Sequence, residues 1–142
     1  MGVVCINSDH RKEAPVRKHA EYNWAQARAD LATAITLRDA GVYYASVFFA
    51  QQAAEKALRA ASLENLRKNP RGHNLVQIAD SLHAPIEVMN ASAELNSDFL
   101  NTRSPEAADA IPYQIYDRES AVRHIEAAEV IINWVRDTYI ML

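Results

Sequence analysis

A narrow polar strip on an otherwise apolar segment is the first feature of the sequence that could do chemistry. Residues 42–66 are predicted to be helical, and at about 100 degrees per residue four polar side chains of this segment project in nearly one direction. They are Gln52, Glu55, Lys56 and Arg59. Lys and Arg could hold a phosphate, and Gln could hydrogen-bond a base or a ribose. A solvent-facing strip stabilised by pairs of opposite charges three or four residues apart is an equally good interpretation.

The histidines are scattered along the chain. No two of them are spaced to bind zinc from one helix face, and the sequence has neither paired cysteines nor a glycine-rich phosphate loop. We therefore expect no metal site and no cofactor. A single histidine lies more often on the surface or hydrogen-bonded in the core than in a catalytic site. The histidines are His10, His19, His73, His83 and His124.

The composition predicts one all-helical domain. The chain has 142 residues, of which 49% are hydrophobic and 23% charged, with only three glycines and five prolines. This length is sufficient for a core without disulfides or a metal. Long stretches rich in Ala, Leu, Glu, Gln and Arg favour helix over sheet. The net charge of −3 excludes a general DNA-coating role, which needs a basic surface, but leaves room for a local basic patch.

Cysteine usage and hydropathy indicate a cytoplasmic protein. The lone cysteine, Cys5, can form neither an internal disulfide nor a metal cage, which suits a reducing compartment. No apolar run approaches the roughly 20 residues of a membrane-spanning helix. Residues 1–20 also lack the apolar middle of a signal peptide. We expect no contact with a membrane.

Apolar periodicity predicts an up-and-down bundle of four to five helices. Gly41 is the expected stop of the first helix, and Asp117 is the expected N-cap of the last one. We expect residues 1–17 to be a flexible N-terminal segment and residues 18–142 to be the helical domain. The predicted helices cover residues 19–40, 42–66, 73–83, 86–100 and 117–139, with a turn at 68–72 and a long loop at 101–116.

The helix at 42–66 is apolar over most of its circumference. Its central stripe consists of Val47, Ala50, Ala54, Ala57, Leu58 and Ala61. Neighbouring helices must bury such a helix on most sides. A small bundle with this much apolar surface is expected to form a homodimer.

Three segments resemble elements of the HEPN family and occur in that family's order. The first, YASVFFAQQAAEKALRA at residues 44–60, is similar to the family's signature helix. The second, GHNLVQIADSL at 72–82, resembles its His-Asp-Leu element, and the third, NTRSPEA at 101–107, resembles its Asn-x-Arg-Tyr-Pro-Asp loop. The resemblance implies a dimeric helical bundle. It also implies a possible RNA-cleaving toxin that is paired with a minimal nucleotidyltransferase.

The resemblance also implies where a ribonuclease site would lie. Ribonuclease members of the family carry an Arg followed, after four to six residues, by a His near the start of the last helix. Arg103 fills the arginine position, but residues 104–110 contain no histidine, and Ser104 replaces the usual Tyr. Arg118 and His124 have a compatible spacing, although their side chains would diverge by about 120 degrees on one helix. Arg67 and His73 are separated equally.

Together these observations favour a HEPN-type protein of a toxin-antitoxin-like pair that binds RNA or a nucleotide. Metal-independent RNA cleavage would depend on Arg103, His73 and His124, with His moving protons and Arg stabilising charge. The predicted binding residues are Gln52, Lys56, Arg59, His73, Asn101 and Arg103. One alternative is a noncatalytic dimeric interaction module that assembles with a nucleotidyltransferase partner. Another is a four-helix protein of unrelated function.

Overall fold

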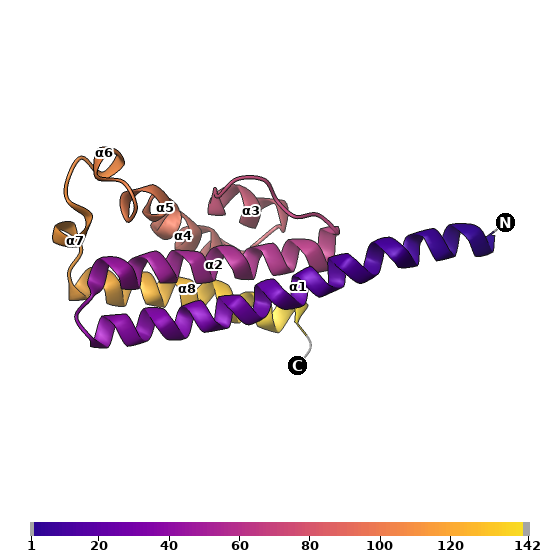
Figure 1. Ribbon diagram of the computed structural model, residues 1–142, viewed down its shortest axis with the longest axis horizontal. Helices are drawn as coiled ribbons and strands as arrows, with labels where there is room; N and C mark the ends of the chain where they lie inside the picture. Colours follow the sequence, from indigo (N-terminus) through magenta and orange to yellow (C-terminus); the bar gives the residue numbers. More distant parts are fainter. Residues whose placement is uncertain (1, 141–142) are drawn as a thin grey trace.

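The chain forms a helical bundle in the computed structural model, which describes the backbone of residues 2–140 and the side chains of residues 16–140. Every regular element in this part of the chain is a helix (Figure 1). The longer helices are α1 (Gly2–Asp39), α2 (Tyr43–Leu66), α4 (Ile86–Asn96) and α8 (Arg118–Tyr139). The shorter ones are α3 (Leu75–Ser81), α5 (Asp98–Asn101), α6 (Pro105–Ala108) and α7 (Pro112–Ile115).

Along the chain, each longer helix runs opposite to the one before it, which confirms the up-and-down bundle (Figure 1). Helix α2 packs against α1 on one side and against α8 on another. Helices α3 and α4 form a further layer, in which α4 contacts α8 and α3 contacts α4. Helix α2 is thus covered within a single chain, so its apolar circumference alone does not require a second copy.

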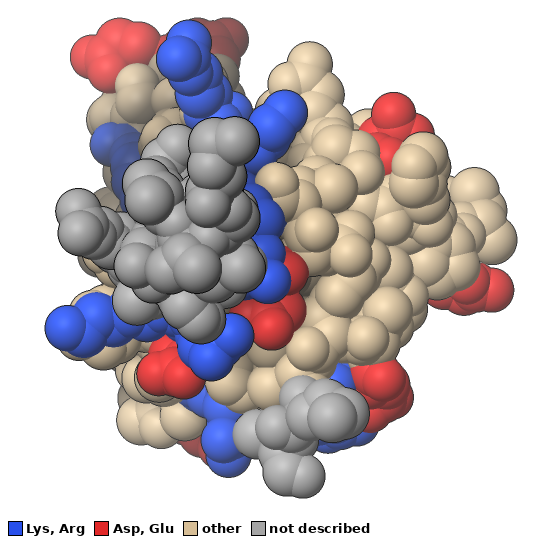
Figure 2. Space-filling view, turned by 90° about the vertical axis from the view of Figure 1, so that its right-hand side faces the viewer, with Lys and Arg blue, Asp and Glu red and all other residues tan. Residues whose placement is uncertain are grey.

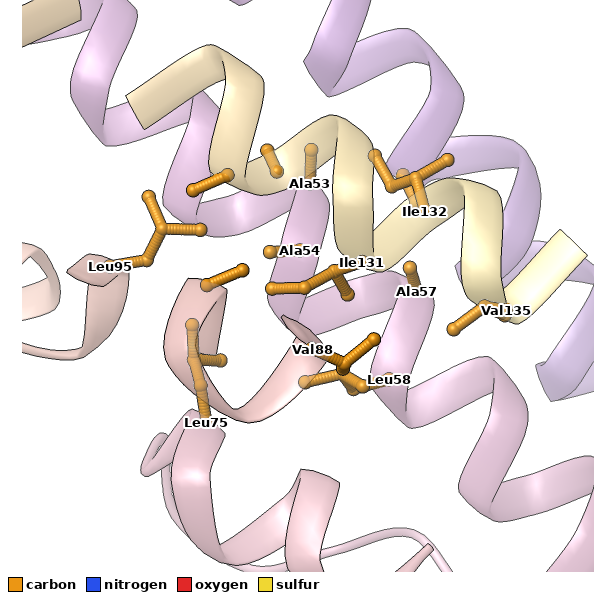
Figure 3. Packing of buried hydrophobic residues seen from close by; sticks show 14 of the residues in the cluster. Ala53, Ala54, Ala57, Leu58, Leu75, Val88, Leu95, Ile131, Ile132 and Val135 are labelled. Atoms are coloured by element: carbon orange, nitrogen blue, oxygen red, sulfur yellow. The ribbon is translucent and has the colours of Figure 1, made fainter. Parts of the chain in front are cut away.

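Alanines bring the central helices close together. All six residues of the predicted α2 stripe are fully buried, which confirms its phase. In Figure 3, Ala53, Ala54 and Ala57 of α2 face Ile131 and Val135 of α8. Because a methyl side chain is small, a neighbouring helix can approach closely enough for contacts with backbone atoms. Ser46 Oγ of α2, for example, donates to the carbonyl of Ala34 in α1 at 2.7 Å.

The C-terminal end of α1 and the start of α8 follow from local chemistry, as predicted. Gly41 has a φ of +80°, a left-handed conformation that costs glycine little, and α1 ends just before it. Asp117 accepts from the Ser120 backbone at 2.8 Å, while the Ser120 hydroxyl accepts from the Asp117 backbone. This reciprocal capping box fixes the start of α8.

Two expectations about the connecting segments are corrected. The predicted helix at 86–100 breaks at Ser97 into α4 and α5. The predicted loop at 101–116 contains the one-turn helices α6 and α7. Each of these turns begins with a proline, Pro105 or Pro112, because proline fits the first helical position without losing a hydrogen bond.

Helix α1 begins at Gly2, so the segment expected to be flexible has a helical backbone that extends past the bundle (Figure 1). The domain boundary at residue 18 stays a prediction. The Cys5 side chain lies outside the described residues. Among the described residues, no helix has the combination of length and apolar character needed to cross a membrane.

Candidate functional site

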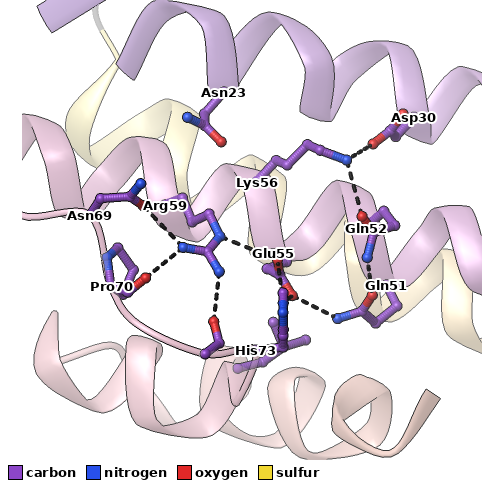
Figure 4. Close-up of polar contacts among 12 residues, drawn as sticks. Asn23, Asp30, Gln51, Gln52, Glu55, Lys56, Arg59, Asn69, Pro70 and His73 are labelled. Carbon is purple, nitrogen blue, oxygen red and sulfur yellow. Dashed lines mark hydrogen bonds and ion pairs between the residues drawn. The ribbon is translucent and has the colours of Figure 1, made fainter. Parts of the chain in front are cut away.

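Glu55 is the centre of the polar strip on α2. Its side chain is only 6% exposed, yet both carboxylate oxygens are occupied. Arg59 Nε donates to Oε2 at 3.2 Å, and His73 Nδ1 lies 2.9 Å from Oε1 and 3.0 Å from Oε2 (Figure 4). Gln51 Nε2 also donates to Oε1 at 3.2 Å. The strip therefore faces protein partners rather than open solvent.

A hydrogen-bonded chain continues from Glu55 to helix α1 (Figure 4). Gln52 Nε2 donates to Gln51 Oε1 at 2.7 Å, and Lys56 Nζ donates to Gln52 Oε1 at 3.2 Å. Lys56 Nζ also lies 2.6 Å from Oδ2 of Asp30, a buried carboxylate on α1. Lys56 is thus engaged in a part-buried ion pair, and the network links α1, α2 and His73.

Arg59 fixes the loop that precedes α3. Each of its three nitrogens donates to a protein oxygen. In addition to Nε on Glu55, Nη1 donates to Asn69 Oδ1 at 3.0 Å and to the Pro70 carbonyl at 2.6 Å. Nη2 donates to the Gly72 carbonyl at 2.6 Å. This arrangement gives Arg59 a positioning role, because most of its donors are already used.

Arg103 stacks on aromatic rings. Its guanidinium carbon lies 4.0 Å from the centroid of Phe99 and 4.4 Å from that of Phe48. Nη1 donates to the Phe99 carbonyl at 3.0 Å. Partial burial lowers the pKa of Arg103, an effect that the negative charge of Glu55 opposes. The residue as a whole remains exposed, so the stacked cation can meet a ligand.

His73 stacks on the same Phe99 ring, with centroids 3.8 Å apart and planes inclined by 14°. At these distances His73 and Arg103 must occupy opposite faces of the ring. Because an ionised carboxylate only accepts hydrogen bonds, the contact with Glu55 places a proton on Nδ1. In the neutral imidazole Nε2 is then an acceptor, and it bonds to none of the described residues. The side chain is 46% exposed.

Asn101 and Phe99 lie on the same short helix, α5. Asn101 is half-buried, and its amide makes no hydrogen bond to a described residue. It follows Phe99 by two positions and precedes Arg103 by two, a spacing at which helical side chains do not face each other, so Asn101 is not part of the stack.

His124 belongs to a separate, buried cluster. Nε2 lies 3.0 Å from Asp98 Oδ2, and Nδ1 lies 2.6 Å from the Ser120 carbonyl. The Tyr116 hydroxyl donates to the other Asp98 oxygen at 2.9 Å. Both imidazole nitrogens thus lie near oxygen atoms that can accept, which favours the doubly protonated form. Burial disfavours this charge, but Asp98, the Ser120 carbonyl and Glu94 outweigh burial and raise the pKa of His124.

The pairing of His124 with Arg118 is not found. Arg118 is exposed at the first position of α8, and among the described residues no hydrogen bond or ion pair joins it to His124. The other compatible spacing also gives no contact: Arg67 is the exposed, left-handed C-cap of α2, and the described side chains show no bond between it and His73. The structure instead brings together His73 and Arg103 through Phe99.

Sequence reasoning missed four contributors to the site: Asp30, Gln51, Phe48 and Phe99. A signal for Asp30 was available, since it lies three residues after Ala27 and four before Ala34, on the buried face of α1. An acidic residue on an apolar face needs a cation. Phe99 precedes Arg103 by four residues, a spacing at which helical side chains meet. No pattern singled out Gln51 or Phe48.

The described side chains offer no group of three His, Cys, Asp or Glu residues that could hold a metal ion. The chemistry available at the Phe99 stack is that of a stacked cation, a carboxylate-held imidazole and aromatic faces. Such groups bind phosphates and bases and can transfer protons.

Comparison with known proteins gives one family and several similar structures. The model of the HEPN domain matches residues 20–138. TT1696 from Thermus thermophilus is 28% identical with a TM-score of 0.75, over 83% of this chain and 96% of that one. ST0689, an archaeal HEPN homologue, is 27% identical with a TM-score of 0.74, over 83% and 95%.

A HEPN domain protein from Thermotoga maritima is also similar. It is 28% identical with a TM-score of 0.65, over 82% of this chain and 95% of that one. Among curated proteins, none matches the chain.

Proposed function

Because the chain belongs to the HEPN domain family, we propose that it binds RNA or a nucleotide at the stack of Arg103, Phe99 and His73, and that it cleaves RNA without a metal. The observation that carries this proposal is the arrangement of His73. Glu55 holds its Nδ1 at 2.9 Å, Phe99 holds its plane at 3.8 Å, and nearly half of the side chain remains exposed. An oriented imidazole beside a guanidinium suits phosphate transfer.

The cleavage step needs only groups that the stack supplies, together with water. Nε2 of His73 takes the proton from a ribose 2′-hydroxyl, and the 2′ oxygen attacks the adjacent phosphorus. The bond from phosphorus to the 5′ oxygen breaks, and that oxygen takes a proton from a water molecule, which in turn takes the proton from Nε2 of His73. The products are a cyclic phosphate and a 5′-hydroxyl, and His73 returns to its neutral form. Arg103 stabilises the negative charge that builds on the phosphate. Glu55 stabilises the imidazolium that forms.

The remaining predicted residues have different parts in this proposal. Asn101, which lies on the same short helix as Phe99, contacts the ligand from outside the stack. Gln52, Lys56 and Arg59 act behind His73, because their polar groups are engaged with Asp30, Glu55 and the loop before α3. His124 supports α5 through Asp98 rather than touching the ligand.

A binding titration tests the proposal. The probe is a fluorescent hexaribonucleotide with 2′-O-methyl groups, which blocks attack by the 2′ oxygen and so isolates binding. We expect Arg103→Ala to weaken binding about tenfold or more, because a charge-assisted contact is lost. His73→Ala should weaken it less. The matched control is Arg118→Ala, which removes an exposed arginine away from the stack. Equal affinity of all four proteins, or no binding by the parent, would overturn the proposal.

Cleavage is tested with an unmodified oligoribonucleotide. We expect cleavage in the presence of EDTA, with a cyclic phosphate product. His73→Ala and Glu55→Gln should reduce the rate, the latter because the tautomer of His73 is no longer fixed. Binding without cleavage by the parent protein would leave RNA binding in place and reject the catalytic part.

A noncatalytic interaction module is the second candidate, and an apolar surface at the turn between α1 and α2 favours it. Val42, Tyr44 and Tyr113 are 37%, 37% and 64% exposed and line one cavity of about 250 Å³. In this reading the chain is a cytoplasmic homodimer that assembles with a minimal nucleotidyltransferase of a toxin-antitoxin-like pair. Exposed apolar groups of this kind mark protein interfaces. Sedimentation of the parent and of Tyr44→Arg tests self-association through this surface.

A further inference from the structure

A second cavity lies beside the loop that leads into His73. It has a volume of about 270 Å³, and Leu66, Pro70 and Ile78 give it apolar walls. Lys68 and Arg71 supply two cations, and none of the lining residues is acidic. Ligand pockets commonly measure about 300–1,000 Å³, so a cavity of this size suits a ligand no larger than one nucleotide unit.

Both cations are available to an anion. Lys68 and Arg71 are exposed, and neither forms an ion pair with a carboxylate in the part of the chain whose side chains are described. Figure 2 looks onto the end of the bundle where α2 stops, and on one half of that face Lys and Arg side chains lie among several Asp and Glu side chains. The cavity lining itself carries two cations and no acidic residue, so on a chain of net negative charge it favours an anionic ligand.

Hydrogen bonds from α2 anchor the backbone that carries these cations. Arg59 donates to the carbonyls of Pro70 and Gly72, both at 2.6 Å, and Ser62 Oγ donates to the carbonyl of Lys68 at 2.9 Å. These bonds therefore fix the conformation of the segment that carries the two cations.

The cavity and the proposed ligand site are close along the chain, because Arg71, which lines the cavity, lies two residues before His73. Phe99 covers one face of the His73 ring at 3.8 Å, and the ring's substantial exposure leaves its other side to a ligand. We propose that this cavity, with Lys68 and Arg71 at its rim, is a subsite for the nucleotide that adjoins the one held at His73 on the same RNA strand. Its base enters the cavity, where Gln77 can hydrogen-bond it, and its phosphate meets Lys68 and Arg71.

This inference rests on the proposed RNA function, and ligand length tests it separately. The probes are a fluorescent mononucleotide and a fluorescent 2′-O-methyl hexaribonucleotide. Lys68→Ala and Arg71→Ala should each weaken binding of the hexamer about threefold to fivefold. The affinity for the mononucleotide should stay unchanged. The salt dependence of hexamer binding should fall by about 0.7 in log–log slope for each cation removed. Arg118→Ala is the control and should change neither affinity.

A variant that keeps both cations tests the cavity itself. Ser81→Phe fills the cavity from its exposed rim. It should weaken binding of the hexamer but not binding of the mononucleotide. Circular dichroism of each variant checks folding. If Arg103→Ala weakens the hexamer while Lys68→Ala, Arg71→Ala and Ser81→Phe do not, the subsite is rejected and the proposed function stands. If the parent binds neither probe, both are rejected.

Discussion

His124 and Asp98 form a buried ion pair that joins α8 to α5. Their contact atoms lie 3.0 Å apart, and the two residues are only 6% and 4% exposed. Asp98 Oδ2 accepts no hydrogen bond from a described residue, so the charge of the nearby imidazolium is its main source of compensation. Buried charges without such compensation are costly. The charge state of His124 therefore matters for folding.

The pKa of His124 gives a stability that depends on pH. Burial acts against the charged imidazole, but Asp98 and the Ser120 carbonyl raise the pKa above its ordinary value of 6.5. The folded state thus binds the proton more tightly than the unfolded state. The contribution is complete below pH 6.5 and is lost as the pH rises through the folded pKa. Urea unfolding between about pH 6 and pH 9 should show a falling free energy.

The matched pair for this test is His124→Gln and His83→Gln. We expect His124→Gln to remove much of the pH dependence and to cost roughly 1–3 kcal/mol at the acid end. His83 is exposed, so its replacement should leave the profile unchanged. Parallel profiles for the parent and His124→Gln would contradict this assignment. The charged neighbours Glu94 and Arg123, together with Tyr116, are unaltered in both variants.

Lys56→Met should destabilise the bundle. The substitution keeps most of the aliphatic side chain but removes the cation from buried Asp30, which among the described side chains then retains a hydrogen bond from Gln26 alone. We expect a loss of about 1–3 kcal/mol in the free energy of unfolding. The double variant Asp30→Asn/Lys56→Met should lose less, because no unpaired charge remains. Additive losses in this cycle would show that the two side chains act independently.

Arg103→Lys should fail to restore the affinity that Arg103→Ala loses. The guanidinium lies over Phe99 and Phe48 while donating to the Phe99 carbonyl, and an ammonium cannot match a planar group that stacks and donates at once. Anisotropy with the methylated hexamer measures this. Affinity of Arg103→Lys equal to the parent would mean that only positive charge is needed and that stacking is dispensable.

Ala54→Glu should unfold the protein or shift its melting temperature strongly downward. Ala54 is fully buried where α2 meets its neighbours, so a carboxylate would be left without a partner in a closely packed core. The same substitution at Ala29, an exposed alanine of α1, is the control. Thermal melts followed by circular dichroism should separate the two variants clearly, and similar melts would contradict the packing described for α2.

The sequence predicted those parts of the fold that depend on local patterns. The apolar stripe from Val47 to Ala61, the glycine stop at Gly41 and the cap at Asp117 each need only neighbouring residues. The break at Ser97 did not follow from periodicity; the residue after it, Asp98, contacts His124 of α8. That contact joins residues far apart in the sequence, so the spacing of apolar residues within one helix cannot predict it.

The candidate site was predictable in its residue types but not in its division of roles. Arg59 and Lys56 have the chemistry of phosphate ligands, yet both meet acceptors from other segments, the loop carbonyls in one case and Asp30 in the other. Arg103 and His73 were expected at the site, and Phe99 explains how they meet. The partner of a long polar side chain is decided by tertiary packing, which residue spacing does not contain.

The anchoring of the 67–72 loop by Arg59 and Ser62 has a thermodynamic consequence. Fixing the backbone of one residue costs about 1–2 kcal/mol in conformational entropy. Here the loop's own contacts with α2 restrict the backbone from Lys68 to Gly72, so this entropy is lost when the chain folds and not when a ligand arrives. A ligand that contacts this loop therefore retains more of its interaction energy as affinity. Arg59→Lys, which cannot reach all of these acceptors, would move that entropic cost to the binding step.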